Sequence, residues 1–105
     1  MQIFHSPLIG NIELTTERKN HILEVHPELK DHLEKLSQVL SDPDEIRRSS
    51  FDKNVLLFYK FFDKVKDGKY INVTVKTGNR NFVLTSYITD KIRAGETYET
   101  EKEYS

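Results

Sequence analysis

The segment VLLFYKFF, residues 55–62, decides the fold, because a nearly continuous apolar run of this length is typical of a central strand covered on both faces, at least in part. Strand patterns also occupy residues 45–50 before it and residues 69–77 and 81–88 after it. Turn residues such as Gly78-Asn79 separate these segments. The sequence therefore predicts a four-stranded antiparallel sheet.

The part of the chain before this sheet has a helical pattern. Four leucines recur at i, i+4, i+7 and i+11 and predict a helix over residues 28–40; they are Leu29, Leu33, Leu36 and Leu40. Thr15 and Thr16 offer N-cap oxygens for a shorter helix that ends near Val25, since Pro27 excludes the residue before it from helical geometry. Residues 1–14 are expected to form a short extended arm. The predicted fold is α+β, with N-terminal helices packed on the four-stranded antiparallel sheet.

Length and composition limit the kind of protein. A chain of 105 residues fits one domain, which we assign to residues 1–95, followed by an acidic, flexible tail over residues 96–105. The absence of cysteine excludes disulfides, thiolate metal sites and a cysteine nucleophile. No apolar run reaches the length of a membrane helix, and the N-terminus lacks a signal-peptide pattern. A cytoplasmic protein is the expectation.

The net charge of −1 hides an uneven distribution. Residues 1–46 contain four basic and nine acidic residues, whereas residues 47–95 contain eleven basic and four acidic ones. The remaining residues, 96–105, contain one basic and four acidic residues. A basic sheet can attract a polyanion, because phosphate contacts dominate affinity for nucleic acids. The alternative is that these charges only keep a small sheet in solution.

His21 and His26 are the first candidates for catalysis. Histidine titrates near neutrality, so two of them around a ribose can act as general base and general acid. RNA supplies its own nucleophile, the 2′-hydroxyl, and this chemistry needs neither a metal nor a cofactor. The spacing of five residues does not place both rings on one helical face as metal ligands. The structural alternative for His26, beside Pro27, is a helix cap.

Cations and hydroxyls on the predicted strands could hold a phosphate. The cations expected to project from the sheet are Arg47, Arg48, Lys60, Lys76 and Arg80. In a ribonuclease such groups stabilise the charge that develops on the phosphate. Thr85 and Tyr87 share one face of the last strand, because side chains two residues apart point the same way.

Four segments resemble a known group of small phage and bacterial proteins. They are LTTER (14–18), HILEVHPEL (21–29), NVLLFYK (54–60) and TSYITDKI (85–92). The group is that of the barnase, EndoU, colicin and RelE-like nucleases, and the resemblance covers about residues 12–95. It implies N-terminal helices on a four-stranded antiparallel sheet. It also implies a cofactor-independent, metal-independent endonuclease that cleaves RNA through a 2′,3′-cyclic phosphate.

The resemblance also assigns roles. His21 and His26 match the helix histidines, Lys60 matches the strand cation, and Thr85 with Tyr87 matches the polar pair of the last strand. Such hydrolases often act as toxins or phage effectors, which suggests tRNA or mRNA as substrate and an antitoxin protein as partner.

Two positions depart from the family pattern. Val25 stands where an arginine is expected, and Lys19 stands where an aromatic residue is expected. Either change would weaken substrate binding or mark a divergent member.

Two other functions compete with cleavage. The chain could be a non-catalytic RNA- or protein-binding module that retains the nuclease-like fold, since a fold alone does not fix a function. Alternatively, the acidic tail could imitate a phosphate chain and cover the basic sheet. A nuclease requires the histidines, a cation and a last-strand hydroxyl to converge on one site, whereas a binding module leaves them scattered.

Overall fold

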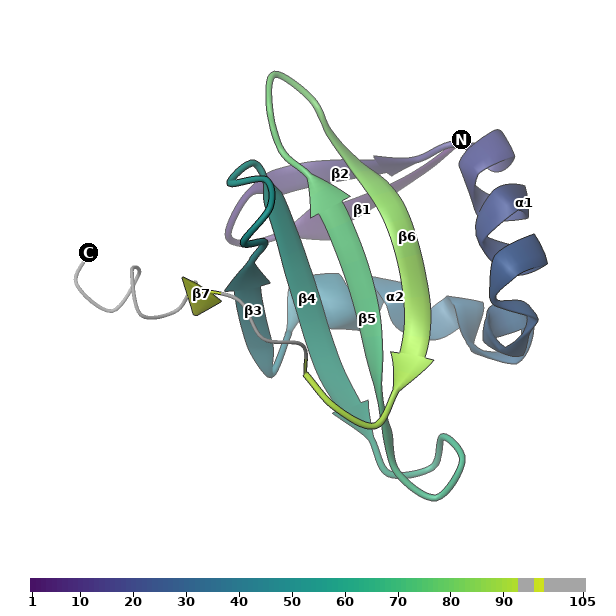
Figure 1. The fold of residues 1–105 in the computed structure, drawn as a ribbon. Helices are drawn as coiled ribbons and strands as arrows, with labels where there is room; N and C mark the ends of the chain where they lie inside the picture. Colours follow the sequence, from purple (N-terminus) through teal and green to yellow (C-terminus); the bar gives the residue numbers. More distant parts are fainter. Residues whose placement is uncertain (93–95, 98–105) are drawn as a thin grey trace.

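One mixed sheet of seven strands organises the chain (Figure 1). This is a computed structural model, and it describes residues 1–92 and 96–97. The strands are β1 (Gln2–Ser6), β2 (Gly10–Leu14), β3 (Glu45–Arg48), β4 (Val55–Phe62), β5 (Lys69–Lys76), β6 (Asn81–Thr89) and β7 (Glu96–Thr97). Their order across the sheet is β1-β2-β6-β5-β4-β3-β7. All neighbours are antiparallel except β2 and β6, which are parallel.

The predicted four-stranded antiparallel sheet is therefore wrong, although strands close to the four expected segments are present. The larger error lies in residues 1–14, which form the hairpin β1–β2 instead of an extended arm; the seventh strand is β7. The register of β2 on β6 places Ile12 opposite Asn81, so the hairpin extends the sheet and makes it mixed. A parallel pair between strands so distant in sequence leaves no local turn signal, and for this reason the pattern did not reveal it.

The turn of this hairpin consists of residues 7–9 and begins with Pro7, and Gly10 is the first residue of β2. Gly10 has a φ of +88°, a conformation that costs glycine little. The Ser6 hydroxyl accepts hydrogen bonds from the backbone N–H groups of Leu8 and Ile9. Phe4 on β1 is buried, so the hairpin belongs to the core.

The first predicted helix is confirmed as α1 (Thr16–Val25). The Thr15 hydroxyl accepts a hydrogen bond from the N–H of Arg18 and caps the first turn. The helix ends where His26 donates its N–H to the carbonyl of Ile22, immediately before Pro27. The next prediction, one helix over residues 28–40, is wrong.

Two short helices occupy that segment. The 3₁₀ helix η1 (Pro27–Lys35) is followed by the α-helix α2 (Leu36–Ser41), and His32 has non-helical angles inside η1. Leu29, Leu36 and Leu40 are nevertheless buried, as the leucine stripe predicts. Hydrophobic spacing thus indicated the buried face correctly but not the type of helix.

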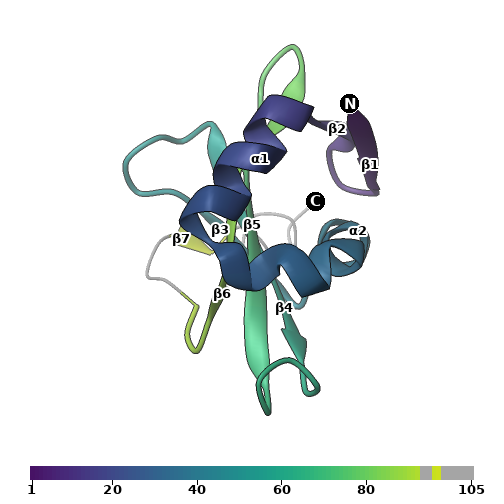
Figure 2. The ribbon, with the colours of Figure 1, turned by 90° about the vertical axis from the view of Figure 1, so that its right-hand side faces the viewer.

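The two faces of the sheet differ in character. One face packs against η1 and α2 through residues such as Phe58 and Val73. The opposite face, which we call the polar face, includes Tyr59, Asn72 and Thr74, because side chains alternate along each strand. Figure 2 shows η1 and α2 on one side of the strands, with the β3–β4 turn and β7 on the other.

The predicted boundary at residue 95 falls before the last strand. β7 pairs antiparallel with β3, so the sheet continues into the first residues of the acidic segment. Residues 98–105, and with them most of the predicted flexible tail, lie outside the described residues. Among the described residues, no helix combines the length and apolar character required to cross a membrane.

Candidate nucleic-acid interface

Helix α1 lies beside β6, and together they form the surface with the candidate site (Figures 1 and 2). Strand β2 pairs with β6 only at Asn81 and Phe82, and α1 lies beside the remaining part of β6. We define the α1–β6 surface by Arg18, His21 and His26 from the helical side and by Phe82, Thr85 and Tyr87 from the strand. Phe82, Thr85 and Tyr87 share the polar face of the sheet, as their cross-strand partners Lys76, Thr74 and Asn72 do.

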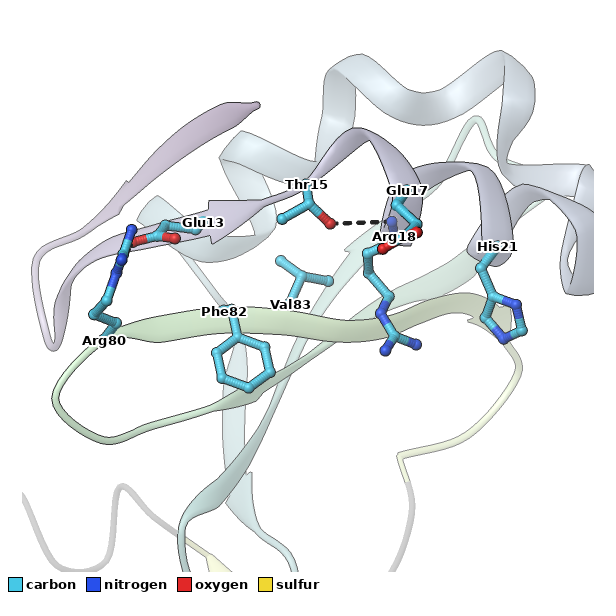
Figure 3. A pocket seen from close by; sticks show the side chains of 8 residues that line it. All are labelled: Glu13, Thr15, Glu17, Arg18, His21, Arg80, Phe82 and Val83. Carbon is cyan, nitrogen blue, oxygen red and sulfur yellow. Dashed lines mark hydrogen bonds and ion pairs between the residues drawn. The ribbon is translucent and has the colours of Figure 1, made fainter.

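A shallow open pocket of about 690 Å³ lies at the end of this surface where α1 and β6 begin, the upper end in Figure 1 (close-up in Figure 3). Arg18 and His21 are three residues apart on α1, and their side chains point in the same direction along β6. The ring of Phe82 is turned to that side of the strand, while Val83 points into the core. Glu13 and Glu17 also line the pocket, so it combines cations, carboxylates and one exposed ring.

His26 and Tyr87 meet at the lower end. Their ring centroids are 5.8 Å apart, with an angle of 34° between the planes. The Tyr87 hydroxyl is buried and has no hydrogen-bond partner among the residues that the structure describes. His26 Nδ1 lies 3.6 Å from a carboxylate oxygen of Glu28, which can orient the imidazole ring. A helix-terminal histidine and a last-strand tyrosine are thus brought together, as the sequence suggested.

A polar row continues from Tyr87 across the sheet. The register places Tyr87 beside Asn72, Asn72 beside Tyr59, and Tyr59 beside Glu45. Asn72 is fully buried, its side-chain oxygen accepts a hydrogen bond from Thr74, and its side-chain amide donates to the carbonyl of Phe58. These bonds fix the middle of the polar face, because a buried amide is costly to leave unpaired.

Arg47 stands at the far end of this face. It forms an ion pair with Glu45, and its register partner Leu57 is followed across the sheet by Thr74 and Thr85. Three strand spacings separate it from Thr85, or roughly 14 Å at about 4.8 Å per strand. Arg47 therefore shares a face with the α1–β6 surface but does not join it.

The other predicted cations are scattered. Lys60 lies on the helix-packed face, where its ammonium is 3.3 Å from Asp42 and 3.5 Å from Asp44. Arg48 alternates with Arg47 and so points away from the polar face. The structure therefore does not bring Lys60 or Arg48 to the histidines.

Two further predicted cations are held by carboxylates. Lys76 lies on the polar face and donates to Asp52, and this hydrogen bond is the main cause of the lowered pKa of Asp52. Arg80 donates to Glu13 at 2.7 Å, which raises the pKa of the Arg80 guanidinium. A cation that is already paired has less charge available for a phosphate.

Arg18 and Phe82 line the candidate site, and sequence reasoning did not select either of them. Within the described chain Arg18 forms no ion pair, and Phe82 is 40% exposed. The spacing of Arg18 and His21 by three residues on a capped helix was a usable signal. The sequence offered no usable signal for the outward direction of Phe82, because Phe82 and Val83 are adjacent apolar residues and either could have faced the core.

No protein-family model matches the chain, and neither a curated protein nor a solved structure matches it significantly. The resemblance to the nuclease group therefore rests on the motifs in the sequence.

Proposed function

We propose that this protein is a metal-independent RNA endonuclease of the toxin or phage-effector type, with its active site on the α1–β6 surface. The observation that carries the proposal is the contact between His26 and Tyr87 at the polar face. Thr85 on the same strand face and Arg18 and His21 on α1 add a hydroxyl, a cation and a second imidazole. These are the groups that cleavage by an RNA 2′-hydroxyl requires.

The mechanism uses the substrate's own nucleophile. The 2′-oxygen attacks the adjacent phosphorus, and the bond from phosphorus to the 5′-oxygen breaks, leaving a 2′,3′-cyclic phosphate. One of His21 and His26 accepts the 2′-hydroxyl proton, and the other donates a proton to the leaving 5′-oxygen. Their backbones are about 7.5 Å apart along the helix axis, at about 1.5 Å per residue. His26 follows the last helical residue, and its ring lies beside Tyr87 on β6.

The remaining groups bind and position the RNA. Arg18 stabilises the charge that accumulates on the phosphate oxygens. Among the described residues it forms no ion pair, which suits it better than Lys60 for this task. Thr85 orients the phosphate, and Tyr87 holds the His26 ring in place.

The test is incubation of the purified protein with cellular RNA in excess EDTA, beside His26→Ala and the control His5→Ala. His5 is exposed on β1, away from the α1–β6 surface. We expect fragments with 2′,3′-cyclic phosphate ends from the wild type and from His5→Ala, and at least about a hundredfold slower cleavage by His26→Ala. Equal rates for all three proteins would remove His26 from the mechanism.

The second candidate is an RNA- or protein-binding module without catalysis, and the placement of Lys60 favours it. A strand cation held by Asp42 and Asp44 on the opposite face cannot serve the histidines. RNA that stays intact at high protein concentration, yet is retained by the protein, would identify an RNA-binding module. Intact RNA without binding would favour a protein partner.

A further inference from the structure

We infer that the α1–β6 surface selects single-stranded RNA, and that Phe82 is the platform on which one unpaired base stacks. This inference rests on the proposed function, because it names the substrate class of the same site. It begins with the exposure of Phe82, which is 40% accessible although its strand neighbour Val83 is buried. An exposed aromatic ring on a sheet is the element that proteins commonly use to bind unstacked bases.

Basic side chains lie on both sides of this ring, although the one on β5 is paired with a carboxylate. Arg18 and His21 lie on the α1 side and line the same pocket as Phe82 (Figure 3). Lys76 is the cross-strand partner of Phe82 on β5, so the two side chains project from the same face. Because Lys76 is paired with Asp52, the charged phosphate is assigned to Arg18 and His21, and the flat base to Phe82.

The pocket also has the size and openness that a base needs. Its volume of about 690 Å³ is within the range of small-molecule sites, and it opens beside the ring. Glu17 lies in the first turn of α1, and its negative charge repels a phosphate at that end of the pocket. The phosphate is therefore expected on the side of Arg18 and His21 that leads toward His26.

A duplex cannot use this arrangement, because its bases are stacked on one another and cannot lie flat on Phe82. RNA helices are instead recognised by shape, across the minor groove. The site should therefore bind unpaired strands and discriminate against double-stranded RNA of the same sequence.

The experiment measures binding of a short 2′-O-methyl RNA strand that carries 2-aminopurine, whose fluorescence is quenched on stacking. The 2′-O-methyl group blocks cleavage, so binding is measured alone. The proteins are the wild type, Phe82→Ala, Phe82→Tyr and the control Phe51→Ala, which removes a ring that is 94% exposed in the β3–β4 turn. Circular dichroism confirms that each variant is folded.

We expect Phe82→Ala to weaken single-strand binding roughly 5- to 150-fold, the loss of one base–aromatic stack, and to abolish the quenching. Phe82→Tyr should retain both, and Phe51→Ala should bind as the wild type does. Equal affinity for single strand and duplex, or wild-type affinity in Phe82→Ala, would overturn the inference. Binding that depends on Phe82, without any cleavage of unmodified RNA, would support this inference and refute the proposed nuclease. Cleavage of RNA that does not depend on Phe82 would support the nuclease and refute this inference.

Discussion

Arg18 and His21 lie three residues apart on α1 and line the same pocket, and Val25 continues their face of the helix one turn later. Val25 is 57% exposed, four residues beyond His21 and seven beyond Arg18. An exposed valine on a helix contributes little to stability, so this position can be changed without disturbing the core.

Val25→Arg should therefore strengthen RNA binding. One additional phosphate contact to a single strand steepens the log–log dependence of affinity on salt by about 0.7. Titrations at several salt concentrations measure this slope, with Ile3→Arg on β1 as a control that adds the same charge elsewhere. An equal gain in the control would mean that net charge, and not position on the α1–β6 surface, determines affinity.

At the scale of the secondary-structure elements, the sequence indicated where the strands lie better than it indicated what packs against them. Periodicity located β3 to β6 closely, because half-buried and central strands carry strong apolar patterns. It did not indicate which face of β4 meets the helices, since residues 55–62 are apolar on both faces. Lys60 was therefore placed at the site although it shares the face of Phe58. His26 and Tyr87 lie close together, as a shared site requires, because a helix end and a strand alternation fix their directions; their role in catalysis stays a prediction.

The β1–β2 hairpin offers the sharpest test of the corrected fold. Phe4 is 3% exposed and packs in the core, whereas the adjacent Ile3 is 49% exposed. Phe4→Ala should reduce the free energy of unfolding by about 3–5 kcal/mol, and Ile3→Ala by less than about 1 kcal/mol. Urea denaturation measures both values, and a neutral Phe4→Ala would show that residues 1–14 form a loose arm after all.

At the scale of the whole molecule, ion pairs hold residues that flank the strands against β5. Lys76 on β5 holds Asp52 in the β3–β4 turn, and Lys69 on β5 holds Asp90 after β6. The hydrogen bond from each lysine is the main cause of the lowered pKa of its carboxyl group. These pairs should make stability depend on pH in the acid range.

The direction of this pH dependence of stability follows from proton uptake by the folded and unfolded chains. Both carboxyls have a folded-state pKa below the ordinary value of 3.8, so near and below that pH the unfolded chain binds more protons than the folded one. The contribution of the pairs is present above about pH 4 and is lost as the pH falls through the lowered pKa. We expect the urea midpoint to fall with acidification, and to fall less in Asp52→Asn than in the wild type. An identical decrease in both proteins would show that the Asp52 pair does not contribute.

The parallel pairing of β2 with β6 has a consequence for synthesis. Glu13 and Arg80, which join the two strands, are 67 residues apart, and Phe82 and Tyr87 emerge from the ribosome long after α1. Since chains are made from the N-terminus, α1 is synthesised before the strand it packs against. The two halves of the candidate site can meet only after β6 has left the ribosome. If the protein cleaves RNA as proposed, a growing chain without β6 would lack half of the residues for it.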